Sequence, residues 1–190
     1  MNIAIFASGS GSNAENIIRY FSSSQLYHFY VFCNNPKAFV IERAKRTDTP
    51  CYIFPRKDFF NAENTPLLLR EKNIDFIVLA GFLQKIPDEI LALYPRKIIN
   101  IHPSLLPKFG GKGMYGHHVH EAVKAAGETR SGITIHYVNE VYDSGTIIFQ
   151  ALCDITPNDT PDDIAQKVHI LEMEHYPKVT EKLLKDLNTL

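Results

Sequence analysis

The feature that most constrains the fold is a regular alternation of short apolar runs with segments of helical spacing. Runs rich in β-branched and aromatic residues predict strands at 2–7, 28–33, 51–54, 75–82 and 97–101. Apolar residues with helical spacing predict helices between them, at 13–23, 38–46, 63–72 and 87–94. Strands that alternate with helices form parallel sheets, and near-continuous apolar strands are expected where helices cover both faces. The sequence therefore predicts a mostly parallel, doubly wound (Rossmann-like) α/β sheet.

The pattern changes after residue 101. A glycine-rich stretch precedes a predicted helix at 117–127, and two predicted strands, 132–140 and 145–155, are joined by a short turn. These strands are expected to extend the sheet with antiparallel members near the C-terminal end. Residues 161–186 form an amphipathic helix whose apolar face holds Ile164, Val168, Leu171, Val179 and Leu183. We find no repeat and no linker, and we predict a single domain over 1–190.

Composition excludes several classes of protein. The net charge of −1 gives no basis for binding a nucleic-acid backbone or an anionic membrane surface. No apolar run reaches the length of a membrane span, and no cationic segment precedes the first apolar run, so no signal peptide is predicted. Three scattered cysteines form no C-x-x-C pair and favour a reducing environment. We therefore expect a soluble, cytoplasmic protein without nucleic-acid or membrane partners.

The stretch "ASGSGSN" at 7–13 lies between the first strand and the first helix, where an open parallel sheet places its ligand crevice. Gly9 and Gly11 permit close backbone approach, and free N–H groups at a helix N-terminus favour an anion. The stretch matches neither a dinucleotide fingerprint nor a Walker loop, so a single phosphate is the expected ligand. A tight turn before a helix capped by Ser12 or Asn13 explains the same residues, and both interpretations stay open here.

Asn100 lies near the end of the predicted buried strand at 97–101 and His102 follows it directly, so both project to the same side if strand geometry persists. An amide can hold a carbonyl oxygen while an imidazole, whose ordinary pKa is near neutrality, moves a proton. Pro103 and Pro107 restrict the backbone just beyond the imidazole. The alternative is a polar strand end with a hydrogen-bonded histidine.

Asp143, in the turn "VYDSG", is a third candidate. A carboxylate that reaches His102 favours the imidazolium form and can order a water or relay a proton, although aspartate before Ser-Gly is also a common turn residue. His136 lies on a predicted strand, and we assign it no role beyond that of a hydrogen-bonded core histidine.

Two further groups carry ionisable side chains. Histidines 117, 118 and 120 form a cluster whose spacing matches no metal motif, so a solvated helix start explains them and no metal is predicted. Glu172 lies at the margin of the apolar stripe, one helical turn from His169. A carboxylate there can receive a substrate amine, or it is an ordinary boundary residue.

With these residues identified, the chain resembles the folate-dependent phosphoribosylglycinamide formyltransferase family from residue 1 to about 182. The resemblance rests on the motifs "SGSGSN", "LAGFLQKIP", "NIHPSLLPKFGGKG", "HYVNEVYDSGTIIFQ" and "EHYP". Such enzymes transfer formyl from 10-formyltetrahydrofolate, used as a co-substrate, to the amine of glycinamide ribonucleotide in purine biosynthesis, and they need no metal. The resemblance implies a formyltransferase fold and small-molecule substrates, with the chain a monomer or a homodimer.

The resemblance also implies roles for individual residues. Asn100, His102 and Asp143 match the catalytic trio. The ribonucleotide phosphate loop is matched by Gly11, Ser12 and Asn13, and the part of the C-terminal helix near the glycinamide end by His169 and Glu172. Segments that line the folate are matched by Leu83, Gln84, Lys85 and Ile86 and by Asn139, Glu140, Val141 and Tyr142.

Three alternatives share parts of this pattern. Formyltetrahydrofolate hydrolases resemble the chain around Asn-x-His but usually carry an N-terminal regulatory domain, and their motif tends to have His where this chain has Pro103. Methionyl-tRNA formyltransferases usually add a tRNA-binding domain and a basic surface. A folate- or nucleotide-binding module without turnover is the third. The presence of Asn100, His102 and Asp143 argues against a module without turnover.

Overall fold

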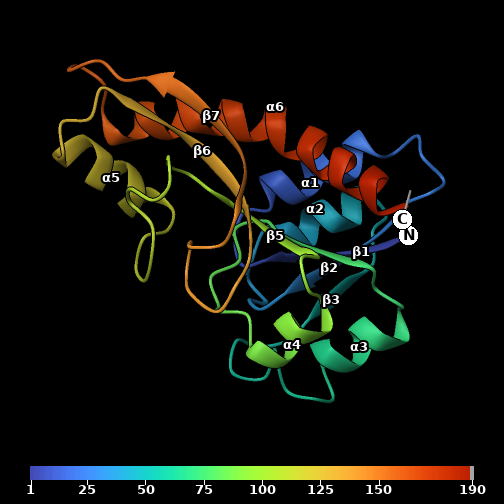
Figure 1. The fold of residues 1–190 in the computed structure, drawn as a ribbon. Helices are drawn as coiled ribbons and strands as arrows, with labels where there is room; N and C mark the ends of the chain where they lie inside the picture. Colours follow the sequence, from blue (N-terminus) through green and yellow to red (C-terminus); the bar gives the residue numbers. More distant parts are fainter. Residues whose placement is uncertain (189–190) are drawn as a thin grey trace. The chain divides into compact units, whose positions relative to one another are not determined.

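A computed structural model describes residues 1–188, and its strands form one seven-stranded sheet in the order β3-β2-β1-β4-β5-β6-β7 (Figure 1). The strands are β1 (Asn2–Ala7), β2 (His28–Cys33), β3 (Cys51–Ile53), β4 (Phe76–Leu79), β5 (Ile98–His102), β6 (Arg130–Tyr137) and β7 (Ile147–Asp154). The helices are α1 (Ser12–Tyr20), α2 (Val40–Arg46), α3 (Thr65–Glu71), α4 (Asp88–Leu93), α5 (His117–Ala125) and α6 (Pro161–Asn188).

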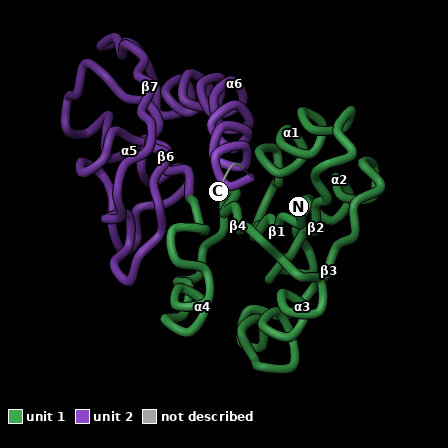
Figure 2. The backbone as a smooth tube through the Cα atoms, turned by 45° about the vertical axis from the view of Figure 1, so that its right-hand side comes forward, with its two compact units in different colours: residues 1–99 green, residues 100–190 purple. Residues whose placement is uncertain are grey.

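The backbone divides into two compact units, residues 1–99 and 100–190 (Figure 2). The boundary falls inside β5. The division does not test whether either unit folds independently, so the single domain over 1–190 stays a prediction. Residues 189 and 190 lie outside the described range.

In the first unit, β1 lies between β2 and β4 and pairs with both in parallel. The side chains of β1 from Ile3 to Ala7 are fully buried, because α1 and α2 cover one face of this part of the sheet and α3 and α4 lie on the other (Figure 1). Four aromatic rings pack around Phe6 in this core: Phe32, Phe59, Phe60 and Phe82. Each fully buried ring of this kind contributes about 1.5–3 kcal/mol of hydrophobic stabilisation.

The order of the strands places a switch point between β1 and β4. The chain runs outward from β1 through β2 to β3, then returns to β4 on the opposite side of β1. Open parallel sheets bind ligands beyond the carboxyl ends of the strands at such a point, because the loops diverge there. The loops after β1 and β4 are joined directly: Ser8 N–H donates to the Gly81 carbonyl at 3.1 Å, and Leu83 N–H donates to Ser8 Oγ at 3.0 Å.

In the second unit, β6 and β7 form an antiparallel pair whose register runs from Arg130 opposite Asp154 to His136 opposite Ile147. Helix α6 packs against β6, β7 and α5. Its buried face is not the predicted one throughout. Val179 and Leu183 are half-buried, whereas Tyr176, Thr180 and Leu184 are fully buried, because a spacing of four carries the buried stripe from Val168 toward the end of the helix.

The predicted α/β class, with its parallel sheet and terminal antiparallel strands, is confirmed. Differences of three residues at one boundary occur at 75–82, where β4 ends at Leu79, at 13–23, where α1 ends at Tyr20, and at 132–140, where β6 ends at Tyr137. Gly81, at φ +71°, turns the chain after β4, so the remaining apolar residues of that run belong to a loop.

Replacing Gly132 by alanine tests the close approach of β6 to β7. A Cβ atom there would lie 2.0 Å from the Ala151 carbonyl oxygen and 2.9 Å from Leu105 Cδ2. We expect Gly132→Ala to lower the free energy of unfolding by about 1–3 kcal/mol, the usual effect of overpacking. The measurement is urea-induced unfolding, with Gly9→Ala as the control because nothing lies within 4 Å of its Cβ position. Equal stability of the two variants would contradict the register of this strand pair.

Candidate active site

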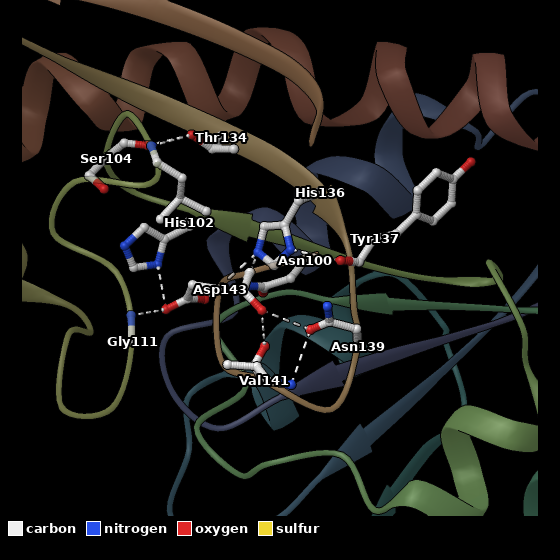
Figure 3. Close-up of polar contacts among 12 residues, drawn as sticks. Asn100, His102, Ser104, Gly111, Thr134, His136, Tyr137, Asn139, Val141 and Asp143 are labelled. Atoms are coloured by element: carbon white, nitrogen blue, oxygen red, sulfur yellow. Dashed lines mark hydrogen bonds and ion pairs between the residues drawn. The ribbon is translucent and has the colours of Figure 1, made fainter. Parts of the chain in front are cut away.

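Asn100 and His102 occupy the last positions of β5 and lie two residues apart, on one side of the strand (Figure 3). Ile98, Ile99 and Ile101 are buried around them, and His102 itself is only 3% exposed. The strand thus carries two polar side chains at its end in an apolar setting, where hydrogen bonds are electrostatically stronger than in water.

Both ring nitrogens of His102 face oxygen acceptors. Nε2 lies 2.8 Å from the Phe109 carbonyl oxygen, and Nδ1 lies 3.5 Å from Asp143 Oδ2. A carbonyl only accepts hydrogen bonds, so Nε2–H donates to Phe109, while the Asp143 carboxylate lies beside Nδ1. The ring is therefore held between a backbone carbonyl and a carboxylate at the end of β5.

The Asp143 carboxylate is shared by three segments of the second unit. Oδ2 accepts a hydrogen bond from Gly111 N–H at 2.9 Å, and Oδ1 lies 3.7 Å from His136 Nε2 (Figure 3). Asp143 has a φ of +53°, in the left-handed region, within a tight turn. Gly145 allows that turn to close on β6, because a Cβ atom there would lie 1.7 Å from the Tyr137 carbonyl oxygen. Glycine at this position brings the carboxylate under the histidines.

His136 links Asn100 to this cluster. Its Nδ1–H donates to the Tyr137 carbonyl at 2.9 Å, which leaves Nε2 to accept from Asn100 Nδ2–H at 3.3 Å. Burial lowers the pKa of His136, although the Tyr137 carbonyl and Asp143 act in the opposite direction. The ring is therefore neutral at neutral pH and orients the Asn100 amide, a function that sequence reasoning missed.

Side chains of β6 and β7 form hydrogen bonds with the backbone just after His102. Thr134 Oγ1 donates to the Ser104 carbonyl at 2.7 Å and accepts from Leu106 N–H at 3.0 Å. Gln150 Nε2 donates to the Leu106 carbonyl at 3.0 Å. Thr134 and His136 lie two residues apart on β6 and project to the same face. This spacing is the sequence signal that both residues position the groups at the end of β5.

The structure corrects the interpretation of the histidine cluster. His117 and His118 are exposed, as expected for a solvated helix start, but His120 is 6% exposed and its Nδ1 has no hydrogen-bond partner among the described residues. Burial lowers the pKa of His120, opposed by the Glu172 carboxylate. Helical periodicity explains the difference, because position 120 falls on the face of α5 that packs against α6.

On α6, His169 and Glu172 are in contact, as their spacing predicts. His169 Nδ1 lies 3.2 Å from Glu172 Oε2, and the Glu172 side chain is 15% exposed while that of His169 is 47% exposed. Glu172 thus presents a largely buried carboxylate close to His120 of α5 and to Tyr176, which lies one turn further along α6.

In the first unit, α1 begins differently from the prediction. Its N-cap is Gly11, at φ +75°, and no side chain caps the helix, so neither Ser12 nor Asn13 takes that role. A Cβ atom at Gly11 would lie 2.4 Å from Val40 Cγ2, which explains why glycine occupies the position. Gly11 and Asn13 are buried and Ser12 is half-buried. The N–H groups of this first turn lack intrahelical acceptors and suit an anion.

The two predicted folate-lining segments lie in different units. In the first, Gln84 accepts from Asn34 Nδ2 at 2.8 Å and donates to the Arg56 carbonyl at 2.8 Å, while Leu83 is exposed and Ile86 is buried. Lys85 lies on the surface, 3.7 Å from Asp88 Oδ1.

In the second unit, Asn139 Oδ1 accepts from Val141 N–H and Ser144 Oγ and shapes the turn that carries Asp143 (Figure 3). Glu140, Val141 and Tyr142 are exposed there. Each segment therefore combines fixed polar groups with exposed apolar side chains.

Metal-binding clusters and membrane-spanning helices are both absent from residues 1–188. No group of three or more histidine, cysteine, aspartate or glutamate side chains is arranged to hold a metal ion, and the metal-free site stays a prediction. Within the same range, no helix combines the length and the apolar character that crossing a bilayer requires.

The doubly wound sheet, with an Asn-His-Asp cluster at the end of a parallel strand, is the architecture of an α/β enzyme that handles a carbonyl group. The chain belongs to the formyl transferase family, whose model, described as "Formyl transferase", matches residues 1–180.

Individual relatives agree with this assignment. The chain is 40% identical over 191 residues to a Bacillus subtilis protein named phosphoribosylglycinamide formyltransferase, covering 95% of this chain and 93% of the relative. It is 38% identical over 194 residues to the chloroplastic protein of that name from Arabidopsis thaliana, covering 96% of this chain. The chain spans 66% of the Arabidopsis relative and 61% of the one from Vigna unguiculata.

Solved structures show the same similarity in three dimensions. The phosphoribosylglycinamide formyltransferase from Bacillus halodurans superimposes with a TM-score of 0.87 at 37% identity, covering 97% of this chain and 95% of that one. The enzyme of that name from Anaplasma phagocytophilum gives 0.89 at 34% identity, covering 98% and 88%.

Acidification tests the neutral state of His136. Its native pKa is lowered from 6.5, so between the native and unfolded values the unfolded state binds more protons. The free energy of unfolding should therefore rise with pH across that window and fall on acidification. We expect His136→Gln to reduce this pH dependence, measured by urea unfolding at about pH 5.5 and about pH 7.5.

His118→Gln is the control, because His118 is exposed and should leave the slope unchanged. Residual dependence from buried His120 is expected in both variants. A slope in His136→Gln equal to that of the unmodified chain would rule out a buried, neutral His136.

Proposed function

We propose that this chain transfers the formyl group of 10-formyltetrahydrofolate to the amine of glycinamide ribonucleotide, giving formylglycinamide ribonucleotide. The observation that carries the proposal is the cluster of Asn100, His102 and Asp143 in a chain that belongs to the formyl transferase family. Named relatives of similar length, such as the Bacillus subtilis protein, support this choice of acceptor.

The reaction begins when the substrate amine attacks the formyl carbon and forms a tetrahedral intermediate. Asn100 Nδ2 has two N–H bonds and donates one to His136, so the other is available to the developing oxyanion. His102 Nε2–H, which the Phe109 carbonyl accepts in this structure, is the second donor once the substrate oxygen takes the place of that carbonyl. Each such donor contributes about 2.7–4 kcal/mol to the transition state.

Proton transfer completes the reaction. Asp143 faces His102 Nδ1 and orients the ring, and a water held by this carboxylate takes the proton that the attacking amine loses. When the bond between the formyl carbon and N10 of the folate breaks, that proton ends on the leaving nitrogen. No net proton is gained or lost, and tetrahydrofolate departs.

Substrate binding is assigned to the flanking residues. The phosphate of the ribonucleotide binds at the first turn of α1, through Gly11, Ser12 and Asn13, and the Glu172 carboxylate, with His169, receives the glycinamide end. The folate contacts two segments, each with an exposed apolar side chain, namely Leu83, Gln84, Lys85 and Ile86 in one and Asn139, Glu140, Val141 and Tyr142 in the other.

The sequence supports proposals about partners, cellular location and oligomeric state. Net charge near zero supports small-molecule substrates and gives no support for nucleic-acid or membrane partners. Three free cysteines support a reducing, cytoplasmic location. We propose a monomer or homodimer, since each chain carries the complete catalytic trio.

Replacing His102 by alanine tests the mechanism. The variant loses an oxyanion donor, so we expect kcat to fall by at least about 100-fold. The measurement is spectrophotometric conversion of 10-formyltetrahydrofolate with glycinamide ribonucleotide, beside circular dichroism to verify folding. His118→Ala is the matched control, since this exposed histidine contacts Glu121 and not the cluster. Full turnover by His102→Ala would refute the assignment.

The dependence on ribonucleotide separates related activities. Formyl loss that requires glycinamide ribonucleotide supports the transferase. Loss at the same rate without it points to a hydrolase, and folate binding without formyl loss points to a binding module.

A further inference from the structure

Helix α2 contacts the loop that follows β1 at three successive residues. Val40 N–H donates to the Gly9 carbonyl at 3.2 Å, and Arg43 Nε–H donates to the Ser10 carbonyl at 2.9 Å. The Val40 side chain also packs directly against Gly11. A helix whose residues are distant in sequence from the loop therefore determines how the loop is oriented.

These contacts affect anion binding through the direction of the carbonyl groups. A backbone concavity binds an anion when its N–H groups face the ligand, while carbonyl oxygens repel it. The oxygens of Gly9 and Ser10 are engaged by donors of α2, so they are not free to turn toward a phosphate. Arg43 is the one charged side chain among these donors.

Arg43 also compensates a negative charge beside the same helix N-terminus. Glu15 lies in the first turn of α1 with a side chain only 11% exposed, and its Oε2 is bonded to Arg43 Nη1. Its Oε1 accepts from Arg19 Nε at 2.9 Å and Nη2 at 2.8 Å. The Arg43 guanidinium, followed by that of Arg19, lowers the pKa of Glu15, so the carboxylate is ionised at neutral pH.

An uncompensated carboxylate at this position would oppose an incoming phosphate, since like charges repel strongly where solvent is partly excluded. With two guanidinium groups against one carboxylate, the cluster carries a net charge of about +1. Removal of Arg43 would both free the Ser10 carbonyl and remove that excess positive charge.

We propose that Arg43 is a positioning residue for the phosphate of the ribonucleotide substrate. It orients the Ser10 carbonyl away from the anion and, together with Arg19, gives the cluster around Glu15 its excess positive charge, without touching the reacting atoms. This inference rests on the proposed function, because the phosphate subsite at Gly11, Ser12 and Asn13 is part of that proposal.

The test is steady-state kinetics of Arg43→Ala with both substrates varied. We expect KM for glycinamide ribonucleotide to rise by about 10- to 100-fold, the range for loss of a charged hydrogen bond. The values of kcat and of KM for 10-formyltetrahydrofolate should stay within about twofold, since neither depends on the phosphate contact. The inhibition constant of inorganic phosphate should rise in parallel with KM for the ribonucleotide.

Arg46→Ala is the matched control. Arg46 lies on the same helix, and its guanidinium carbon is 5.2 Å from the centre of the Phe39 ring, compared with 5.0 Å for Arg43. No contact between Arg46 and the loop is found among the described residues, so its variant should keep the KM of the unmodified chain. Arg43→Lys should fall between the two, because lysine restores the charge but not the planar fork.

The double variant Glu15→Gln with Arg43→Ala separates the two effects of Arg43. Partial recovery of ribonucleotide affinity relative to Arg43→Ala is expected, because the cluster is neutral in Arg43→Ala and the loss of the Glu15 charge leaves the positive charge of Arg19. No recovery would overturn the charge-compensating part of the proposal. The positioning role is wrong if Arg43→Ala keeps the KM of Arg46→Ala. It is also wrong if kcat falls and both KM values rise to the same degree.

Calorimetric titration with inorganic phosphate makes the test independent of turnover. An unmodified chain that binds phosphate but transfers no formyl group would refute the proposed function, while weaker phosphate binding by Arg43→Ala would still support the role of Arg43. Active enzyme with unchanged phosphate binding in Arg43→Ala would refute the role of Arg43 alone.

Discussion

The organisation of the candidate centre depends on the carboxylate of Asp143. It faces Nδ1 of His102 at 3.5 Å, accepts from Gly111 N–H at 2.9 Å and lies 3.7 Å from His136 Nε2. One carboxylate thus connects the end of β5, the glycine-rich loop at Gly111 and the end of β6. Charged hydrogen bonds of this kind are stronger than neutral ones, and an unpaired buried carboxylate would be strongly unfavourable, so the three segments are expected to order together.

Hydrogen bonds between side chains and backbone groups distant in sequence fix the loops around both proposed substrate sites. In the first unit, Arg43 engages the carbonyl of Ser10 and Leu83 N–H donates to the hydroxyl of Ser8. In the second, Thr134 engages the carbonyl of Ser104 and the N–H of Leu106. Each loop is held by a partner distant in sequence, so its own residues remain available to a ligand. Such second contacts hold reactive groups within the small tolerances that catalysis needs.

Prediction from sequence succeeded where a single periodicity decides the structure. Alternation of strand and helix patterns gave the parallel sheet, and strand alternation placed Asn100 and His102 on one side. It failed where packing against another helix decides whether a residue is buried or which residue fits at a position. His120 was assigned to solvent because it follows two other histidines, yet packing of α5 on α6 buries it. The sequence allows Ser12 or Asn13 to cap α1, yet the N-cap is Gly11, where Val40 leaves no room for a Cβ atom.

The sequence by itself determined the α/β class, the position of the Asn-x-His motif at a strand end and the glycines of the first loop. These features depend on residues near one another in the chain, and local sterics and periodicity are sufficient to read them. Only the tertiary structure decided that His136 orients Asn100, that Gly145 admits the Asp143 turn and that Arg43 anchors the loop before α1. Those contacts join residues 28 or more positions apart or depend on close backbone approach, and no local pattern encodes such distances.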